Sequence, residues 1–276
     1  MNYRHAFHAG NHADVFKHAA LTLILARLAA KPQPFMVLDT HAGVGAYDLT
    51  SDAAQRTREC KAGAGLVFGR PLPAAPAYAE LLASMNPAGR LVAYPGSPEI
   101  ARRLLRASDR LVLCELHPDD AAVLKARYRA DPRVHVHRRD GYEAAVALAP
   151  PPERRGLVLI DPPFEALDET ARLVGALATT LRKWPTGVFC AWYPIKDHAI
   201  GDTLARAARD GGWPKPLRAE FLAYPRDGAS MAGGGLLIAN APWKLDAELE
   251  ALCRELHPIL GEGHGSWRVE WINPPP

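Results

Sequence analysis

The sequence predicts an α/β fold built on a mainly parallel sheet with helices on both faces. Apolar runs alternate with helical patterns through about residue 192, which is the pattern of βα units. The run from Leu157 to Ile160 is apolar at every position, as expected of a strand buried on both faces. Two later strands are joined by the short loop 224–235. We therefore expect an antiparallel hairpin to complete a sheet of seven strands.

The composition is that of an ordinary globular protein. With 276 residues, 48% of them hydrophobic and 23% charged, the chain can form one large domain or one domain with an insertion. No apolar run is long enough to span a bilayer, and the N-terminus lacks the apolar segment of a signal peptide. The 4 cysteines lack CxxC spacing, which argues against a zinc site and a disulfide framework. We expect a cytoplasmic location.

The positive charge is mostly arginine, and it is clustered. The net charge is only +3, but arginines gather at 102–106, 133–139 and 154–155. Arginine is favoured where phosphates are bound, so contact with nucleic acid is one interpretation. The other interpretation of these arginines is a solvated helix face.

Residues 3–18, YRHAFHAGNHADVFKH, are interpreted as too polar and too rich in histidine to be core. Within them, Asn11 is a plausible N-cap of a helix whose apolar pattern runs over residues 13–30. A proline soon after this pattern marks its end.

Four polar side chains in this N-terminal region are candidates for contacts. Lys17 and His18 lie in the first turns of the helix and are expected to face a ligand, with solvated positions as the alternative. His8 and His12 have the spacing of a metal pair, but no third ligand lies nearby. We predict no metal site.

A predicted strand over residues 35–39 leads into a glycine loop. The strand ends at Asp39 and is followed by Thr40, His41, Ala42, Gly43, Val44 and Gly45. Two glycines beyond a strand let the backbone approach a nucleotide-like cofactor closely. The GxGxxG pattern of dinucleotide sites is missing, and Asp48 stands where its third small residue would be. The missing residue and the acids favour a cationic cofactor without phosphates, such as S-adenosylmethionine, over NAD.

Residues 50–92 differ from the rest in composition, being rich in alanine and broken by prolines. In a nucleotide-binding βαβ unit, the acid that holds the ribose lies about 20 residues beyond the glycine turn. The best candidate here is Glu115, which is much further along. An inserted helical subdomain at 50–92 explains this distance, and residues 1–49 and 93–276 then form the main domain.

The main fold resumes with YPGSP at residues 94–98. Ser97 is predicted to be a helix N-cap, with Pro98 at the first helical position. The next strand, 110–114, ends at Glu115, which is placed to bind both hydroxyls of a ribose. A cap of the following helix is the structural alternative for this acid.

A helix at 119–130 and a strand at 134–137 lead to Asp140 and Gly141. An acid at this third strand end can accept a hydrogen bond from an adenine amino group, and a turn-forming Asp-Gly pair is the alternative. The strand that ends at Asp161 comes fourth. The remaining expected elements are helices at 167–182, 200–210 and 245–260, strands at 187–192, 218–223 and 236–240, and a possible edge strand at 267–271.

The fourth strand ends abruptly in Asp161, Pro162, Pro163 and Phe164. Prolines supply no N–H donors and stiffen the backbone, so the Asp161 carboxylate and the Pro162 carbonyl can act together as acceptors. Phe164 offers a flat apolar surface. This combination suits an amino group on a flat ring. Two segments imitate it, but residues 240–243 fall in the antiparallel part and residues 273–276 lie at the terminus.

Six separated segments resemble one known family. In chain order they are YRHAFHAGNHADVFKH, LDTHAGVGAYDL, YPGSP, ELHP, DGY and LIDPPF. Together they resemble the RlmJ family, the ribosomal large-subunit RNA adenine-N6 methyltransferases, through nearly the whole chain. One departure is Ala241, where the family usually has a second proline. This departure bears on that loop and not on Asp161.

The resemblance implies a Rossmann-like class I methyltransferase fold. It implies transfer of a methyl group from S-adenosylmethionine to the N6 of one adenosine in 23S rRNA, as naked RNA or an early assembly intermediate. The implied cofactor contacts are Lys17, His18, Ser97, Glu115, Asp140 with Gly141, and Asp161, with the loop from Asp39 through His41 and Gly43 beside the methionine part. Tyr3 is implied to lie near the methyl-transfer site as a gate. We expect a monomer with no membrane or metal partner, in which residues 50–92 are candidates for RNA contact.

Three other functions are alternatives for the same residues. A DNA adenine-N6 methyltransferase shares the chemistry of residues 161–164, but it ordinarily carries a larger target-recognition domain than the tail after Asn240 provides. A nicotinamide oxidoreductase is disfavoured by Asp48 and the acids around the glycine loop. A non-catalytic RNA-binding assembly factor has no use for paired acceptors aimed at an amine.

Overall fold

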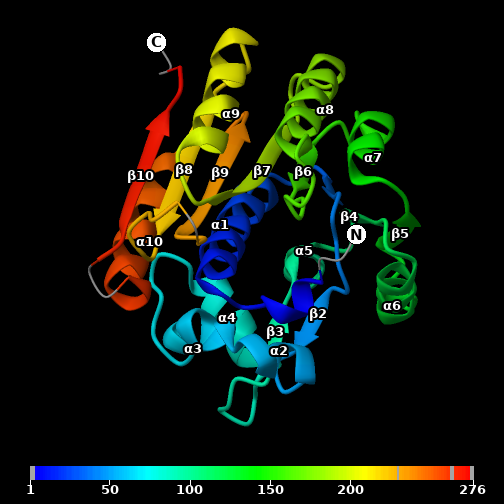
Figure 1. Ribbon diagram of the computed structural model, residues 1–276. Coiled ribbons are helices and arrows are strands. Elements are labelled where there is room, and N and C mark those ends of the chain that lie inside the picture. The colour runs from blue at the N-terminus through cyan, green and yellow to red at the C-terminus, as the bar shows by residue number, and fades with distance from the viewer. Residues whose placement is uncertain (1–3, 229, 262–263, 274–276) are drawn as a thin grey trace.

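The computed structural model describes residues 4–228, 230–261 and 264–273. Its main sheet has the strand order β10-β8-β9-β7-β6-β1-β4-β5 (Figure 1). The parallel strands are β1 (Met36–Asp39), β4 (Arg110–Glu115), β5 (Val134–Arg138), β6 (Gly156–Ile160) and β7 (Val188–Ile195). The antiparallel hairpin is formed by β8 (Leu217–Leu222) and β9 (Gly233–Ala239). The mainly parallel sheet and its hairpin are confirmed.

The strand count differs from the predicted seven. Among the described residues the main sheet has 8 strands, because β10 (Ser266–Trp271) pairs antiparallel with β8. A separate two-stranded sheet pairs β2 (Ala46–Asp48) with β3 (Ala93–Pro95). The two short strands therefore bring together the ends of the segment predicted to be an insertion.

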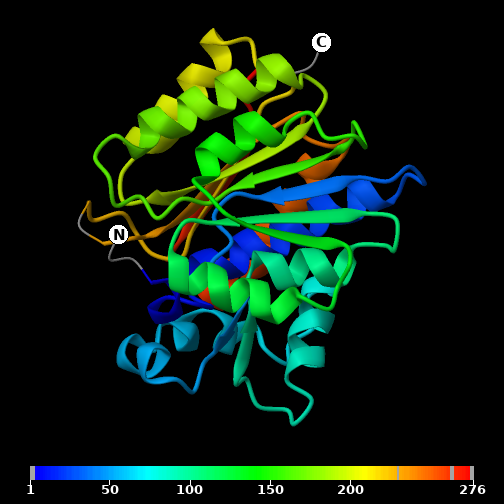
Figure 2. The same ribbon diagram turned by 90° about the vertical axis from the view of Figure 1, so that its right-hand side faces the viewer.

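Helices cover both faces of the main sheet, as the two layers on either side of it in Figure 2 show. The first layer contains α1 (His12–Ala29), α5 (Ser97–Leu104), α6 (Pro118–Tyr128) and α10 (Leu245–Leu260), and α4 (Pro76–Met85) packs against α1. The second contains α7 (Gly141–Leu148), α8 (Glu169–Lys183) and α9 (Ala199–Asp210). Each layer packs on its own apolar core, which is why β6 is buried at every position. No helix in the described part of the chain is both long and apolar enough to cross a membrane.

Helix α1 is part of the core, so the interpretation of residues 3–18 as too polar to be core is wrong from His12 onward. Asn11 caps the helix as predicted, accepting a hydrogen bond of 2.9 Å from the N–H of Asp14. The side chains of Asp14, Lys17 and His18 are nevertheless buried. Lys17 pairs with Asp14 and Asp161, and Nδ1 of His18 contacts the hydroxyl of Tyr94, so solvated positions for Lys17 and His18 are excluded.

The segment 50–92 is helical, as its composition predicts. It contains α2 (Asp52–Thr57), η2 (Glu59–Ala62), α3 (Ala64–Val67) and α4, and a further short helix, η1 (His5–Phe7), lies before α1. Side chains of the segment such as Val67 and Tyr78 belong to the same apolar core as α1 and α10. Its status as a separate subdomain stays a prediction.

Ser97 is not the N-cap of its helix. The cap of α5 is Gly96, so Ser97 is the first helical residue and Pro98 moves to the second position. The N–H of Gly96 donates to the carbonyl of Gly45 over 2.9 Å, and a Cβ on Gly96 would lie only 2.9 Å from that oxygen. The close approach of the two backbones requires glycine at the cap.

Candidate active site

A cavity of about 700 Å³ opens at the carboxyl edge of the parallel strands. Register places the ends of β1 and β6 side by side, because Asp39 pairs with Leu159, two residues before Asp161. Most of the predicted site residues line the cavity: Lys17, His18, His41, Gly43, Ser97, Glu115, Asp140, Gly141, Asp161, Pro162 and Phe164. Asp39 is not among them and is 1% exposed. Tyr3 lies outside the described residues.

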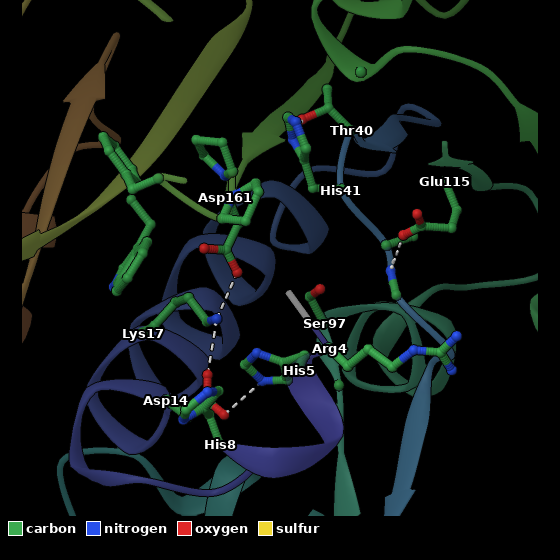
Figure 3. A pocket seen from close by; sticks show the side chains of 18 of the residues that line it. Arg4, His5, His8, Asp14, Lys17, Thr40, His41, Ser97, Glu115 and Asp161 are labelled. Atoms are coloured by element: carbon green, nitrogen blue, oxygen red, sulfur yellow. Dashed lines mark hydrogen bonds and ion pairs between the residues drawn. The ribbon is translucent and has the colours of Figure 1, made fainter. Parts of the chain in front are cut away.

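The ammonium of Lys17 is held between two carboxylates (Figure 3). Its Nζ is 2.5 Å from Oδ2 of Asp161 and 2.8 Å from Oδ1 of Asp14, and the Lys17 side chain is only 4% exposed. The other oxygen of Asp14 contacts Nε2 of His5 at 2.8 Å and accepts from the N–H of Gly10 at 2.9 Å. A chain of polar contacts therefore runs from the N-terminal segment through α1 to the loop after β6.

Ion pairing fixes the protonation states of Lys17 and Asp14. Burial by itself lowers the pKa of Lys17, but the Asp14 and Asp161 carboxylates outweigh it and raise the pKa above its ordinary value. Burial raises the pKa of Asp14, yet its contacts with His5 and Lys17 outweigh burial and hold the pKa well below its usual range. Lys17 is thus an ammonium facing ionised Asp14.

Only one oxygen of Asp161 takes part in these polar contacts. The hydrogen bonds between described residues use Oδ2, and Oδ1 has no partner among them. Because Asp161 lines the cavity, Oδ1 is left as an acceptor for a bound group. Lys17 therefore fixes the side chain without occupying both of its oxygens.

Phe164 and Trp192 form an aromatic wall beside Asp161. Their ring centroids are 6.0 Å apart at an interplanar angle of 70°, and both side chains line the cavity. Phe164 has a φ of +51°, which is uncommon for a residue with a side chain and is found at functional sites. Sequence reasoning missed Trp192. Its signal is an aromatic residue near the end of the strand that neighbours β6 in the sheet.

The backbone of the glycine loop donates a hydrogen bond to the side chain of Glu115. The N–H of Gly43, which has a φ of +58°, donates to Oε2 of Glu115 over 2.8 Å, and the N–H of His117 donates to Oε1 over 2.8 Å. The cap of α6 is His117, so Glu115 is not the structural cap considered for it. Each Glu115 oxygen keeps a lone pair for a ligand.

Asp48 does not lie at the cavity, although the sequence places it where the third small residue of a dinucleotide-binding loop would be. Its carboxylate accepts hydrogen bonds from the backbone and hydroxyl of Thr50, in an exposed turn that does not line the cavity. The use of Asp48 as an argument against a pyrophosphate is therefore wrong.

Asp140 combines a structural contact with a place in the cavity. Its Oδ1 caps α7 by accepting from the N–H groups of Tyr142 and Glu143, and its Oδ2 accepts from Arg172 over 2.8 Å. The ring of His41 packs edge-on against Tyr142, with centroids 5.2 Å apart. Burial lowers the pKa of His41 to about 4, so this imidazole is neutral at pH 7.

Asp39 is a buried acid behind the cavity. Burial raises its pKa to about 7, although Ser97 and the backbone of His41 lower it in part. Its Oδ2 is buried and has no hydrogen-bond partner among the described residues. Oδ2 of Asp39 is therefore an unsatisfied acceptor, and the charge of this acid is sensitive to pH.

The residues considered for a metal are used otherwise. Nδ1 of His8 contacts Glu59 at 2.8 Å, and His12 packs edge-on against Tyr224. No group of three histidine, cysteine, aspartate or glutamate side chains in the described ranges is arranged to hold a metal ion.

Comparison with known proteins identifies close relatives. Residues 32–273 match the family described as "Ribosomal RNA large subunit methyltransferase D, RlmJ". Proteins named "Ribosomal RNA large subunit methyltransferase J" from Escherichia coli and Haemophilus influenzae are 40% and 39% identical to this chain, over 99% of the chain and 99% of each relative. A crystal structure of a protein from Legionella pneumophila is 36% identical, with a TM-score of 0.89, over 96% of this chain and 98% of that one.

A more distant structure shares the fold alone. A probable spermidine synthase from Corynebacterium glutamicum superposes with a TM-score of 0.52 at 14% identity, covering 93% of this chain and 75% of that one.

Asp39 makes stability depend on pH. Its folded pKa of about 7 lies above the ordinary 3.8, so the folded state keeps a proton that the unfolded state loses, and stability falls as pH rises through this window. We expect Asp39→Asn, which mimics the neutral acid, to gain about 2–4 kcal/mol relative to wild type between pH 4 and pH 8. Denaturant unfolding of both proteins across this range measures the change. A difference that does not vary with pH contradicts it.

Proposed function

This chain belongs to the RlmJ family of ribosomal RNA large subunit methyltransferases, and we propose that it methylates the exocyclic N6 of one adenosine in 23S rRNA. The observation that carries the proposal is Asp161, fixed by Lys17 through one oxygen and open through the other, beside the aromatic wall. The substrate is naked RNA or an early assembly intermediate.

The donor set of the cavity fits S-adenosylmethionine. Glu115 suits the two ribose hydroxyls, and Asp140 with Gly141 suits the adenine end. Lys17, His18, Ser97 and the loop from Asp39 to Gly45 are assigned to the methionine end. The unsatisfied oxygen of Asp39 suits a cationic ligand close by. When bound, the cofactor supplies a methyl group activated by a sulfonium, and its product is S-adenosylhomocysteine.

The chain's own residues orient the amino group. Oδ1 of Asp161 and the carbonyl of Pro162 accept hydrogen bonds from its two N–H groups, which gives the nitrogen more tetrahedral character and directs its lone pair at the methyl group. Pro163 stiffens the turn that presents the two acceptors. The nitrogen then gains the methyl group and loses one proton to solvent after attack.

The base is held out of its helix by the aromatic wall. Phe164 stacks on the flipped or unpaired adenine, and Trp192 supports Phe164 from the side. Among the residues at the cavity's rim, Arg4 and Lys196 are cations suited to the neighbouring phosphates. We propose further that residues 50–92 form a subdomain that contacts RNA, and that the protein works as a cytoplasmic monomer without a metal.

Asp161→Ala is expected to abolish methyl transfer, because the amino group loses the acceptor that orients it. The assay follows tritium from labelled S-adenosylmethionine into 23S rRNA transcribed in vitro. Glu165→Ala is the matched control, since it removes an exposed acid from the same loop. Full transfer by Asp161→Ala, or equal loss in both variants, contradicts the assignment.

Phe164→Leu is expected to raise KM for RNA by about tenfold, since base stacking on an aromatic ring contributes about 1–3 kcal/mol. The affinity for S-adenosylhomocysteine, measured by calorimetry, is expected to stay within twofold of wild type. An unchanged KM argues that no base stacks on this ring.

A further inference from the structure

His18 connects the cavity to a buried pair of tyrosines. Its Nδ1 is 2.9 Å from the hydroxyl of Tyr94, and that hydroxyl is 3.2 Å from the hydroxyl of Tyr78. The exposed fraction is 1% for His18 and 0% for each tyrosine. His18, Tyr94 and Tyr78 thus form a row of three hydrogen-bonded side chains. Tyr94 belongs to β3 and Tyr78 to α4, so the row leads from the 50–92 segment to the wall of the cavity.

The far end of the row sets the direction of its hydrogen bonds. The hydroxyl of Tyr78 contacts Tyr94 and has no other hydrogen-bond partner among the described residues. If His18 donated to Tyr94, Tyr94 would donate to Tyr78, and the hydrogen of Tyr78 would be buried without an acceptor. A buried donor left unpaired is costly. In the opposite direction, each hydroxyl hydrogen has an acceptor.

We propose that Tyr94 is a positioning residue that fixes His18 as the tautomer with its hydrogen on Nε2. A neutral imidazole has one donor and one acceptor nitrogen, so accepting at Nδ1 leaves the donor at Nε2. Nε2 has no hydrogen-bond partner among the described residues, and His18 lines the cavity. His18 therefore offers a fixed N–H to a bound ligand.

The ligand class follows from the donor. The N–H of His18 suits an acceptor on the cofactor, and S-adenosylmethionine offers a carboxylate, ribose hydroxyls and ring nitrogens. This step rests on the proposed function. The tautomer itself does not, because it is a property of the protein without ligand.

The protonation states agree with this arrangement. Burial, and then the charge of Lys17, lower the pKa of His18 well below its ordinary value, although Asp14 opposes them, so the ring is neutral. Burial raises the pKa of Tyr78 and of Tyr94, so both remain phenols able to donate.

The tautomer is measured directly by nitrogen NMR of the full-length protein, labelled with ¹⁵N and free of ligand, at pH 7. The signals of His18 are assigned from their loss in His18→Gln. We expect Nδ1 at the shift of an unprotonated ring nitrogen and Nε2 at that of a protonated one, with a mixture of tautomers in Tyr94→Phe. The reverse pattern in the wild type overturns the proposal and leaves the proposed methylation untouched.

Cofactor affinity gives the second test, with a matched control in the same row. Tyr94→Phe removes the partner of His18 and is expected to weaken S-adenosylhomocysteine binding about fivefold in calorimetry, as for one hydrogen bond. Tyr78→Phe removes the neighbouring buried hydroxyl but keeps Tyr94 as a donor, so affinity is expected to stay within twofold. Equal weakening in both variants, or none in Tyr94→Phe, overturns the proposal.

Discussion

Lys17 carries a positive charge almost wholly removed from water, and the carboxylates of Asp14 and Asp161 compensate it. A buried charge that loses one partner is costly, typically by about 3–5 kcal/mol, so the three groups hold one another in place. The contact joins α1 to the loop after β6 across 144 residues of sequence. It also leaves the second oxygen of Asp161 available, and the proposed chemistry depends on this oxygen.

The parallel sheet supplies the frame for this contact. Strands β1, β4, β5 and β6 all end at one edge, so acids far apart in sequence surround a single cavity. Glu115 is held by backbone N–H groups, whereas Asp161 is held by a side-chain cation. Backbone contacts suit the end of the cavity that we propose for the cofactor. At the proposed substrate end, Lys17 fixes Asp161 and leaves one of its oxygens open.

Local sequence patterns predicted most of the fold and much of the cavity lining. Alternating apolar runs placed the strands, and acids at strand ends converge because parallel strands share an edge. Burial of Lys17 could not be predicted, because it depends on Asp161, which only folding brings near. Ser97 was misplaced by one residue because the close approach of Gly45 and Gly96 is a tertiary contact. The last strand was left out of the count because an edge strand with half-buried side chains carries a weak pattern.

A double-mutant cycle in the free energy of unfolding tests the role of Lys17 most directly. The proteins are wild type, Lys17→Met, Asp161→Asn and the double variant, compared by denaturant unfolding at pH 7. We expect Lys17→Met to destabilise strongly and Asp161→Asn to relieve part of that loss, with a coupling of about 2 kcal/mol between the two positions. Effects that add within about 0.5 kcal/mol would show that the buried ammonium does not hold Asp161.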